Sequence, residues 1–123
     1  MKLKHIDIVS IPVRDQQAAR NFYTKMLGFK VVRDDPMGPS QRWIQLAPPG
    51  AETSISLVTW FEAMPAGSVQ GLVLGTDDID AAQAELTQRG VRVSPVRREA
   101  WGRFATFNDP DGNGWVLAQS LSS

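Results

Sequence analysis

Side chains that commonly catalyse reactions or bind metal ions are scarce in this chain. Its 123 residues include one histidine, His5, and no cysteine, which excludes disulfides, thiolate metal sites and cysteine nucleophiles. The acidic pairs Asp34-Asp35 and Asp77-Asp78 are interpreted as a solvated loop and a helix cap, not as acid–base catalysts. No serine-nucleophile motif, glycine-rich phosphate loop or dinucleotide fingerprint is present. The residue types therefore favour binding over catalysis.

Aromatic side chains are the residues best suited to bind a ligand. Tryptophan faces stack on flat molecules, and an arginine can hold a carboxylate or phosphate through two parallel hydrogen bonds. Trp101 and Arg103 lie two residues apart, and Arg42-Trp43 is a similar pair. The chain has four tryptophans, which all lie in or beside expected strands: Trp43, Trp60, Trp101 and Trp115.

Composition and charge describe an ordinary globular chain. Hydrophobic residues make up 42% and charged residues 21%, and 123 residues fit one domain. The 13 basic and 13 acidic residues give zero net charge and form no basic stripe, so a nucleic-acid partner is not expected. Apolar runs are too short to span a bilayer, and the N-terminus does not resemble a signal peptide. The expectation is a soluble, cytoplasmic protein.

The strands and helices that must position these side chains form an internal repeat, which occurs twice along the chain. A shift of 63 residues aligns Asp15 with Asp78 and Thr24 with Thr87, and Gly28 then aligns with Gly90 after the loss of one residue. In each half, a strand is followed by a helix, which begins at an aspartate cap and ends at a glycine. The helices are predicted near residues 15–27 and 78–89.

Three more strands are expected after each helix. Alternating apolar residues and turn signals bound every strand, and Asp109-Pro110-Asp111-Gly112 predicts a tight turn before the last one. Trp115 shares a strand face with Leu117 and is expected in the core. The predicted strands are Ile6–Val13, Phe29–Val32, Trp43–Leu46 and Ser54–Trp60 in the first half, with a turn-rich stretch at Asp34–Ser40, and Leu72–Leu74, Val91–Val93, Arg103–Phe107 and Gly114–Ala118 in the second.

Several of these segments resemble the vicinal-oxygen-chelate superfamily of glyoxalases, bleomycin-resistance proteins and dioxygenases. The resemblance lies in the strand ending Val13-Arg14-Asp15, in the helix ending Phe22-Tyr23 to Leu27-Gly28-Phe29, and in the Asp-Pro-Asp-Gly turn. It implies an α+β fold of two βαβββ modules in a single domain, residues 1–123, with repeat one at about 4–62 and repeat two at about 68–121. It also implies a cavity site, often completed by a second subunit.

Metal-dependent members of that family carry four ligands on the cavity face. The resemblance places these positions at Ile8, Ser56, Gly71 and Val116, with the register of Ser56 uncertain by one residue. None of the four offers an imidazole or carboxylate, so no metal and no cofactor is expected. His5 lies three residues before Ile8, and an odd offset on a strand turns it to the opposite face.

The preferred hypothesis is a metal-free protein that sequesters a small aromatic or amphipathic molecule in the cleft of a homodimer. The alternative is a metal-dependent lyase, isomerase or dioxygenase of the same superfamily, and a domain with a protein partner also stays open. The family resemblance puts the segment at Trp101 on the cavity rim. The expected ligand-binding residues are Ile8, Ser10, Trp43, Ser56, Trp60, Gly71, Trp101, Arg103 and Val116.

Overall fold

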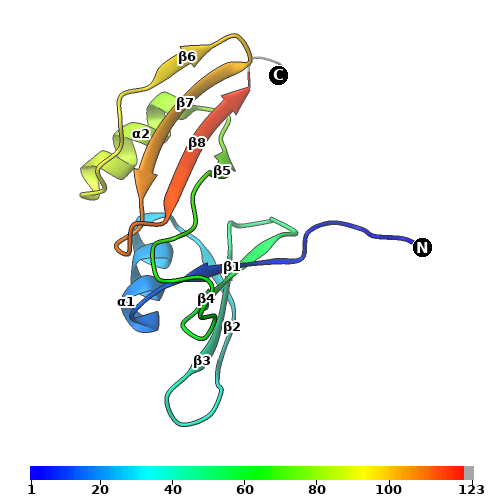
Figure 1. Ribbon diagram of the computed structural model, residues 1–123. Coiled ribbons are helices and arrows are strands. Elements are labelled where there is room, and N and C mark those ends of the chain that lie inside the picture. The colour runs from blue at the N-terminus through cyan, green and yellow to red at the C-terminus, as the bar shows by residue number, and fades with distance from the viewer. Residues whose placement is uncertain (121–123) are drawn as a thin grey trace.

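Each half of the chain folds as one βαβββ module in the computed structural model, which describes residues 1–120 (Figure 1). The predicted fold class is confirmed. The predicted end of the second repeat, residue 121, lies outside the described residues. The first module contains β1 (Ile8–Pro12), α1 (Gln16–Asn21), the π-helical turn η1 (Phe22–Met26), β2 (Lys30–Pro36), β3 (Arg42–Ala47) and β4 (Ser54–Val58). The second contains β5 (Leu72–Gly75), α2 (Ile79–Gln88), β6 (Arg97–Glu99), β7 (Gly102–Asn108) and β8 (Gly114–Ser120).

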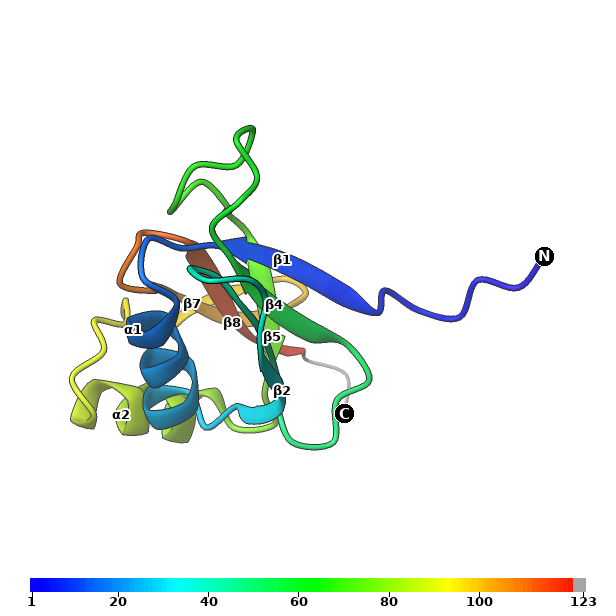
Figure 2. The ribbon, with the colours of Figure 1, turned by 90° about the horizontal axis from the view of Figure 1, so that it is seen from below.

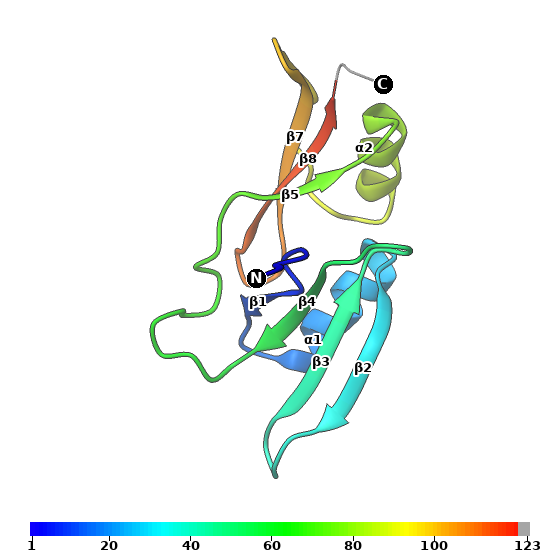
Figure 3. The ribbon, with the colours of Figure 1, turned by 90° about the vertical axis from the view of Figure 1, so that its right-hand side faces the viewer.

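Both modules have the same sheet topology. The strand orders are β1-β4-β3-β2 and β5-β8-β7-β6, and the first strand of each module pairs with the last in parallel. The remaining pairs are antiparallel. α1 covers one face of the first sheet and α2 one face of the second (Figures 1 and 3), so each sheet has a second face that no helix covers. We call these two surfaces the open faces.

The predicted helix signals act at their expected positions. Asp15 and Asp78 each accept a hydrogen bond, of 3.0 Å, from the backbone N–H three residues further on. Gly28 and Gly90, after the two helices, have φ values of 75° and 96°, which only glycine adopts at little cost. The aspartate caps and the glycines therefore mark where both helices begin and end.

Two predicted segments are wrong. Val91–Val93 is not a strand, and the strand lies at β6, Arg97–Glu99. Pro95 has no N–H to give to a ladder, and the Ser94 hydroxyl accepts the amide of Thr106 (2.9 Å) in place of a backbone carbonyl. The turn-rich stretch predicted from Asp34 is also wrong at its start, because β2 continues to Pro36 and pairs with β3 as far as Arg42.

Aromatic side chains from both modules share one core (Figure 2 shows the two halves packed together). Tyr23 of η1 is fully buried, and its ring centroid lies 5.8 Å from that of Trp115 on β8. Trp115 is 4% exposed, which confirms its predicted place in the core. The Trp115 indole donates a hydrogen bond to the Tyr23 hydroxyl (3.0 Å), and this hydroxyl donates one to Asp109 (2.7 Å). Burial and the Asp109 charge raise the pKa of Tyr23 above its ordinary range.

A second polar link joins the modules at the end of β1. The amide of Asn113, which is fully buried, donates to the carbonyl of Pro12 (2.8 Å) and to Asp109 (2.8 Å). Arg14, just after β1, contacts Asp111 through its backbone N–H (3.0 Å) and its guanidinium (3.2 Å). The Asp-Pro-Asp-Gly turn thus anchors the second module on the first. Among residues 1–120, no helix has the length and apolar character needed to cross a membrane.

Candidate ligand-binding site

The open face of the first sheet is polar. Val9 and Ile55 belong to or pack against the core, so their neighbours Ile8, Ser10 and Ser56 point to the opposite face. The strand register places Ile8 beside Ser54, and Ser10 beside Ser56. The predicted site residues of β1 and β4 therefore lie together on this face.

A chain of hydrogen bonds runs across this face from β3 to β4. The Trp43 indole donates to the side-chain oxygen of Gln45 (3.1 Å), and the Gln45 amide donates to the Ser54 hydroxyl (2.8 Å). Ser56, opposite Gln45 in the register, is fully buried, and its hydroxyl has no hydrogen-bond partner among residues 1–120. A buried hydroxyl without a partner is costly, and the side chains around Ser56 leave its hydroxyl unpaired within the first sheet.

The segment after β4 carries the predicted residue Trp60. β4 ends at Val58, so Trp60 lies in the following loop and not in the strand. Its ring centroid is 6.2 Å from that of Phe61, which is 49% exposed. Figures 2 and 3 show this green loop projecting from the body of the first module.

The open face of the second sheet is mostly apolar. Val73 and Thr106 flank Val116 in the register, and Phe104 pairs with Ala118 two residues along β8. Val73 is 63% exposed. This face thus offers a hydrophobic surface to any molecule that approaches it.

Trp101 stands at one end of this apolar face. It lies between β6 and β7, is 54% exposed, and its ring lies 6.0 Å from that of Phe104 at an interplanar angle of 25°. Two nearly parallel rings form a platform on which a flat ligand can stack. Trp101 also lines a cleft of about 560 Å³ with Thr76, Ala118 and Gln119.

Arg103 points away from this platform. It pairs with Gln119, on the side of the sheet that α2 covers, and its guanidinium binds Asp80 of α2 (2.8 Å) and the Gln119 side chain (3.1 Å). Gln119 also accepts the N–H of Ile79 (2.8 Å), the first residue of α2. Arg103 therefore does not line the cleft beside Trp101, but it binds Gln119, which does.

Arg42 is also held by partners within the protein. Its guanidinium makes two hydrogen bonds to Asp34 (3.1 and 2.6 Å) and one to Gln17 (2.7 Å). Arg20 adds an ion pair to the same carboxylate at 2.9 Å. Hydrogen bonds from Arg42 and the positive charges of Arg42 and Arg20 lower the pKa of Asp34. Arg42 is thus a structural cation and not a free ligand contact.

The four positions that correspond to family metal ligands do not fit a divalent ion. Ile8 and Val116 have no donor atoms, and Ser56 has only a neutral hydroxyl. Gly71 has a φ of 81°, so a histidine or glutamate at this position would strain the backbone. Within residues 1–120, no group of three or more His, Asp or Glu side chains is arranged to hold a metal.

His5 lies outside both open faces, in the extended arm before β1. Its imidazole is 3.5 Å from Glu52 and 3.8 Å from Asp7, contacts that attract only when the ring is protonated. This pairing explains the single histidine without a catalytic role.

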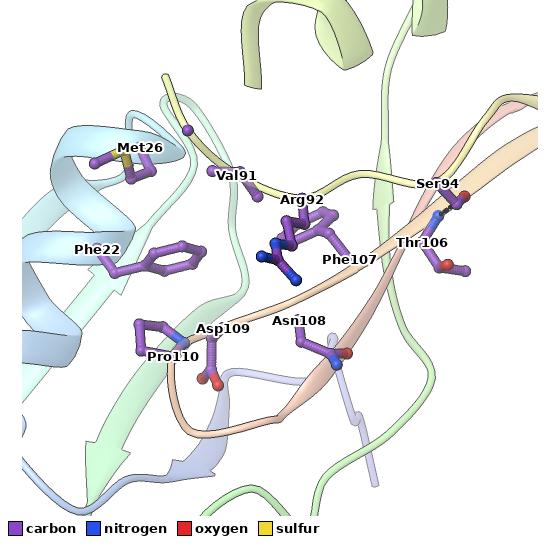
Figure 4. A pocket seen from close by; sticks show the side chains of 11 residues that line it. Phe22, Met26, Val91, Arg92, Ser94, Thr106, Phe107, Asn108, Asp109 and Pro110 are labelled. Atoms are coloured by element: carbon purple, nitrogen blue, oxygen red, sulfur yellow. Dashed lines mark hydrogen bonds between the residues drawn. The ribbon is translucent and has the colours of Figure 1, made fainter. Parts of the chain in front are cut away.

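A second cleft, of about 690 Å³, lies between the modules, and sequence reasoning missed it (Figure 4). It is bordered by η1, by the loop after α2 and by the end of β7, which lie far apart in the sequence. Gln45 and Phe104 on the open faces were missed too, although strand periodicity from Trp43 would have found Gln45, and a count from the Asp109–Gly112 turn would have paired Phe104 with Ala118. The cleft had no such signal, because it depends on how the modules pack.

Comparisons with known proteins agree with this geometry. The model of the Glyoxalase/Bleomycin resistance protein/Dioxygenase superfamily matches residues 2–117. The uncharacterized protein YetH of Bacillus subtilis is 37% identical over 121 residues, which cover 95% of this chain and 99% of that protein.

Two solved structures extend the comparison. TnmS3, an antibiotic binding protein from Streptomyces sp. CB03234, is 48% identical and superimposes with a TM-score of 0.93 over 98% of both chains. A superfamily member from Sphaerobacter thermophilus is 36% identical, with a TM-score of 0.87 over 96% of this chain and 98% of that one. The match therefore extends over both modules.

Proposed function

This chain belongs to the Glyoxalase/Bleomycin resistance protein/Dioxygenase superfamily, and we propose that it binds a small, flat, partly aromatic molecule and sequesters it without chemical change. The observation that carries this proposal is the pairing of two open faces of different character. One presents tryptophan, glutamine and serine side chains, and the other presents a stacked pair of rings, Trp101 and Phe104. Polar groups on one side and an apolar platform on the other suit an amphipathic ligand.

Similarity to TnmS3 supports a binding role. That protein is described as antibiotic binding, and 48% identity over nearly the whole of both chains makes a related role reasonable for this one. We propose the same broad class of ligand, a bioactive small organic molecule, for this chain. Ile8, Ser10, Trp43, Ser56, Trp60, Gly71, Trp101 and Val116 are its proposed contacts. Arg103 enters only as the residue that holds Gln119 in place.

We also propose that binding needs no metal. The superfamily's lyases, isomerases and dioxygenases use a metal as a Lewis acid, and the four corresponding positions here lack ligands. We propose instead that the Ser56 hydroxyl, which is fully buried and has no partner among residues 1–120, bonds to a ligand carbonyl or hydroxyl once the groups that cover it move. A metal-dependent activity is the alternative, and no arrangement of side chains on the open faces favours it.

A homodimer is part of the proposal. In a single chain, the open face of the second sheet exposes Val73 and Trp101, and Phe61 is exposed beside the first sheet. Exposed apolar surface of this kind is commonly buried on association, and a second copy would turn each open face into the wall of a closed cavity. Light scattering at micromolar concentration should give twice the chain mass of 13.5 kDa, and a monomer would contradict this part of the proposal.

Fluorescence titration tests the binding role itself. Planar aromatic compounds, neutral and anionic, should quench tryptophan emission saturably. Trp101→Ala should weaken binding by about 1–3 kcal/mol, because it removes a stacking anchor. Met37→Ala, in the turn after β2, is the matched control and should leave affinity unchanged. Equal affinity for the wild type and Trp101→Ala would refute the role of the platform. The cytoplasmic location stays a prediction, which cell fractionation would test.

A further inference from the structure

We infer that the cleft between the modules is a second binding site, for a small aromatic molecule that carries a carboxylate. This site is separate from the open faces, because it is bordered by the end of η1, the loop after α2 and the end of β7 (Figure 4). Its volume of about 690 Å³ is within the range of small-molecule sites.

The walls of the cleft are suited to the apolar part of such a molecule. Phe22 and Met26 come from one face of η1, and both are only partly buried against the core. Phe107 of β7, 3% exposed, forms the opposite wall. Figure 4 shows the Phe22 ring directed across the cleft toward Arg92. A ring placed between an aromatic and a thioether side chain gains favourable contacts with both.

Arg92 supplies a positive charge that nothing nearby neutralises. Six of the nine arginines, including Arg14, Arg42 and Arg103, bind an acidic side chain. Arg92 makes no ion pair or hydrogen bond with any residue from 1 to 120. Arg92 is exposed, and its side chain lines the cleft (Figure 4). A guanidinium with all its N–H groups free is the preferred partner of a carboxylate.

The backbone of β7 adds a second donor. Thr106 exchanges hydrogen bonds with Ser94 on the outer side of the strand, and the N–H of Asp109 points the other way, to Asn113 (2.9 Å). Strand amides alternate in direction, so the N–H of Asn108 is on the outer side with Thr106. β6 pairs with β7 only as far as Phe104, so it offers no partner to the N–H of Asn108, a residue that lines the cleft.

The carboxylate of Asp109 also lines the cleft but does not oppose an anion strongly. It is 5% exposed and accepts four hydrogen bonds: from the Tyr23 hydroxyl, the backbone N–H groups of Asp111 and Asn113, and the Asn113 side chain. These donors already balance much of its charge. Arg92 and Asn108 therefore determine the sign of the ligand.

A nuclear magnetic resonance titration tests this site in the full chain. The probes are 2-naphthoate and its neutral analogue 2-naphthamide, followed by ¹H–¹⁵N spectra. We expect 2-naphthoate to shift the amides of residues 22–26, 90–94 and 106–110. Arg92→Gln should weaken 2-naphthoate binding about five- to tenfold, as for a partly exposed charged hydrogen bond, and leave 2-naphthamide binding unchanged. Arg92→Glu should abolish the 2-naphthoate shifts.

Arg97→Gln is the matched control. Arg97 is an exposed arginine of β6 outside the cleft, so its loss changes net charge equally without touching the site. Shifts confined to the open faces, or equal weakening by Arg92→Gln and Arg97→Gln, would overturn the inference. Trp101→Ala should leave the 2-naphthoate shifts in the cleft unchanged, so this result separates the second site from the proposed open-face site.

Discussion

Replacing Asp109 with asparagine tests whether the buried polar network, and not apolar packing alone, holds the two modules together. The Asp109 carboxylate accepts hydrogen bonds of 2.7 Å from Tyr23, 2.8 Å from the Asn113 side chain, and 2.9 Å from each of two backbone N–H groups. An asparagine keeps the shape but turns one acceptor oxygen into a donor NH₂. Its oxygen can stay with the two backbone N–H groups, and its NH₂ then faces the two side-chain donors.

The cost of this exchange follows from the donors that lose a partner. The Asn113 amide keeps its bond to Pro12 but loses the one to residue 109, and the Tyr23 hydroxyl loses the acceptor of its hydrogen bond. A buried donor that loses a charged acceptor costs about 1–3 kcal/mol, so two such donors lower the free energy of unfolding by about 3 kcal/mol. For a chain of this length, that corresponds to a fall of about 10–15 °C in Tm.

Urea and thermal unfolding, followed by circular dichroism, measure this loss. Asp77→Asn is the matched control, because Asp77 is exposed and the same exchange there should change stability by less than about 0.5 kcal/mol. Tyr23→Phe removes the hydroxyl, so the loss caused by Asp109→Asn should be smaller in its background than in the wild type. If Asp109→Asn lowers stability by no more than Asp77→Asn, the network has no role in joining the modules.

Three further predictions concern ionisation and metals. Tyr23 is the only tyrosine, and its pKa is raised, so absorbance near 295 nm should show no phenolate until the protein unfolds in alkali. The stability that comes from this neutral hydroxyl is lost as the pH rises above about 10, which is the pKa of tyrosine in the unfolded chain. The pKa of Asp34 is lowered, so its contribution is present above about pH 4 and lost below it, and the stability gap between wild type and Asp34→Asn should shrink on acidification. Nickel, zinc, iron and manganese should leave Tm unchanged. A small rise in Tm that His5→Ala abolishes would mark an incidental surface site. A large rise in Tm that persists in His5→Ala would contradict the metal-free proposal.

The sequence predicted the elements whose causes are local. Asp15, Gly28, Asp78 and Gly90 act through one or two hydrogen bonds or a single backbone angle, so each can be read without knowing the fold. The misplaced strand at Val91–Val93 failed because apolar alternation was weighed above Pro95, whose effect is equally local.

The site was harder to predict because it depends on register and docking. Arg103 lies on the helix-covered side because it pairs with Gln119, which is two residues from the core residue Leu117. That pairing follows from the length of the Asp109–Gly112 turn, and a count from the turn would have found it. The inter-module cleft brings Phe22 together with Arg92 and Asn108, and no pattern within one segment predicts such a meeting.

The buried network has a consequence for binding as well as for stability. The two open faces belong to different modules, and the contacts of Tyr23 and Asn113 with Asp109 and Pro12 help to fix the angle between them. The affinity for a molecule that binds both open faces then depends on these hydrogen bonds, although the molecule does not contact the residues that form them. Asp109→Asn should therefore weaken the binding of aromatic ligands to the open faces at temperatures well below its Tm, while Glu85→Gln, an exposed position on α2, should not. Full affinity in a folded Asp109→Asn variant would mean that each open face binds by itself, and that the network only stabilises the fold.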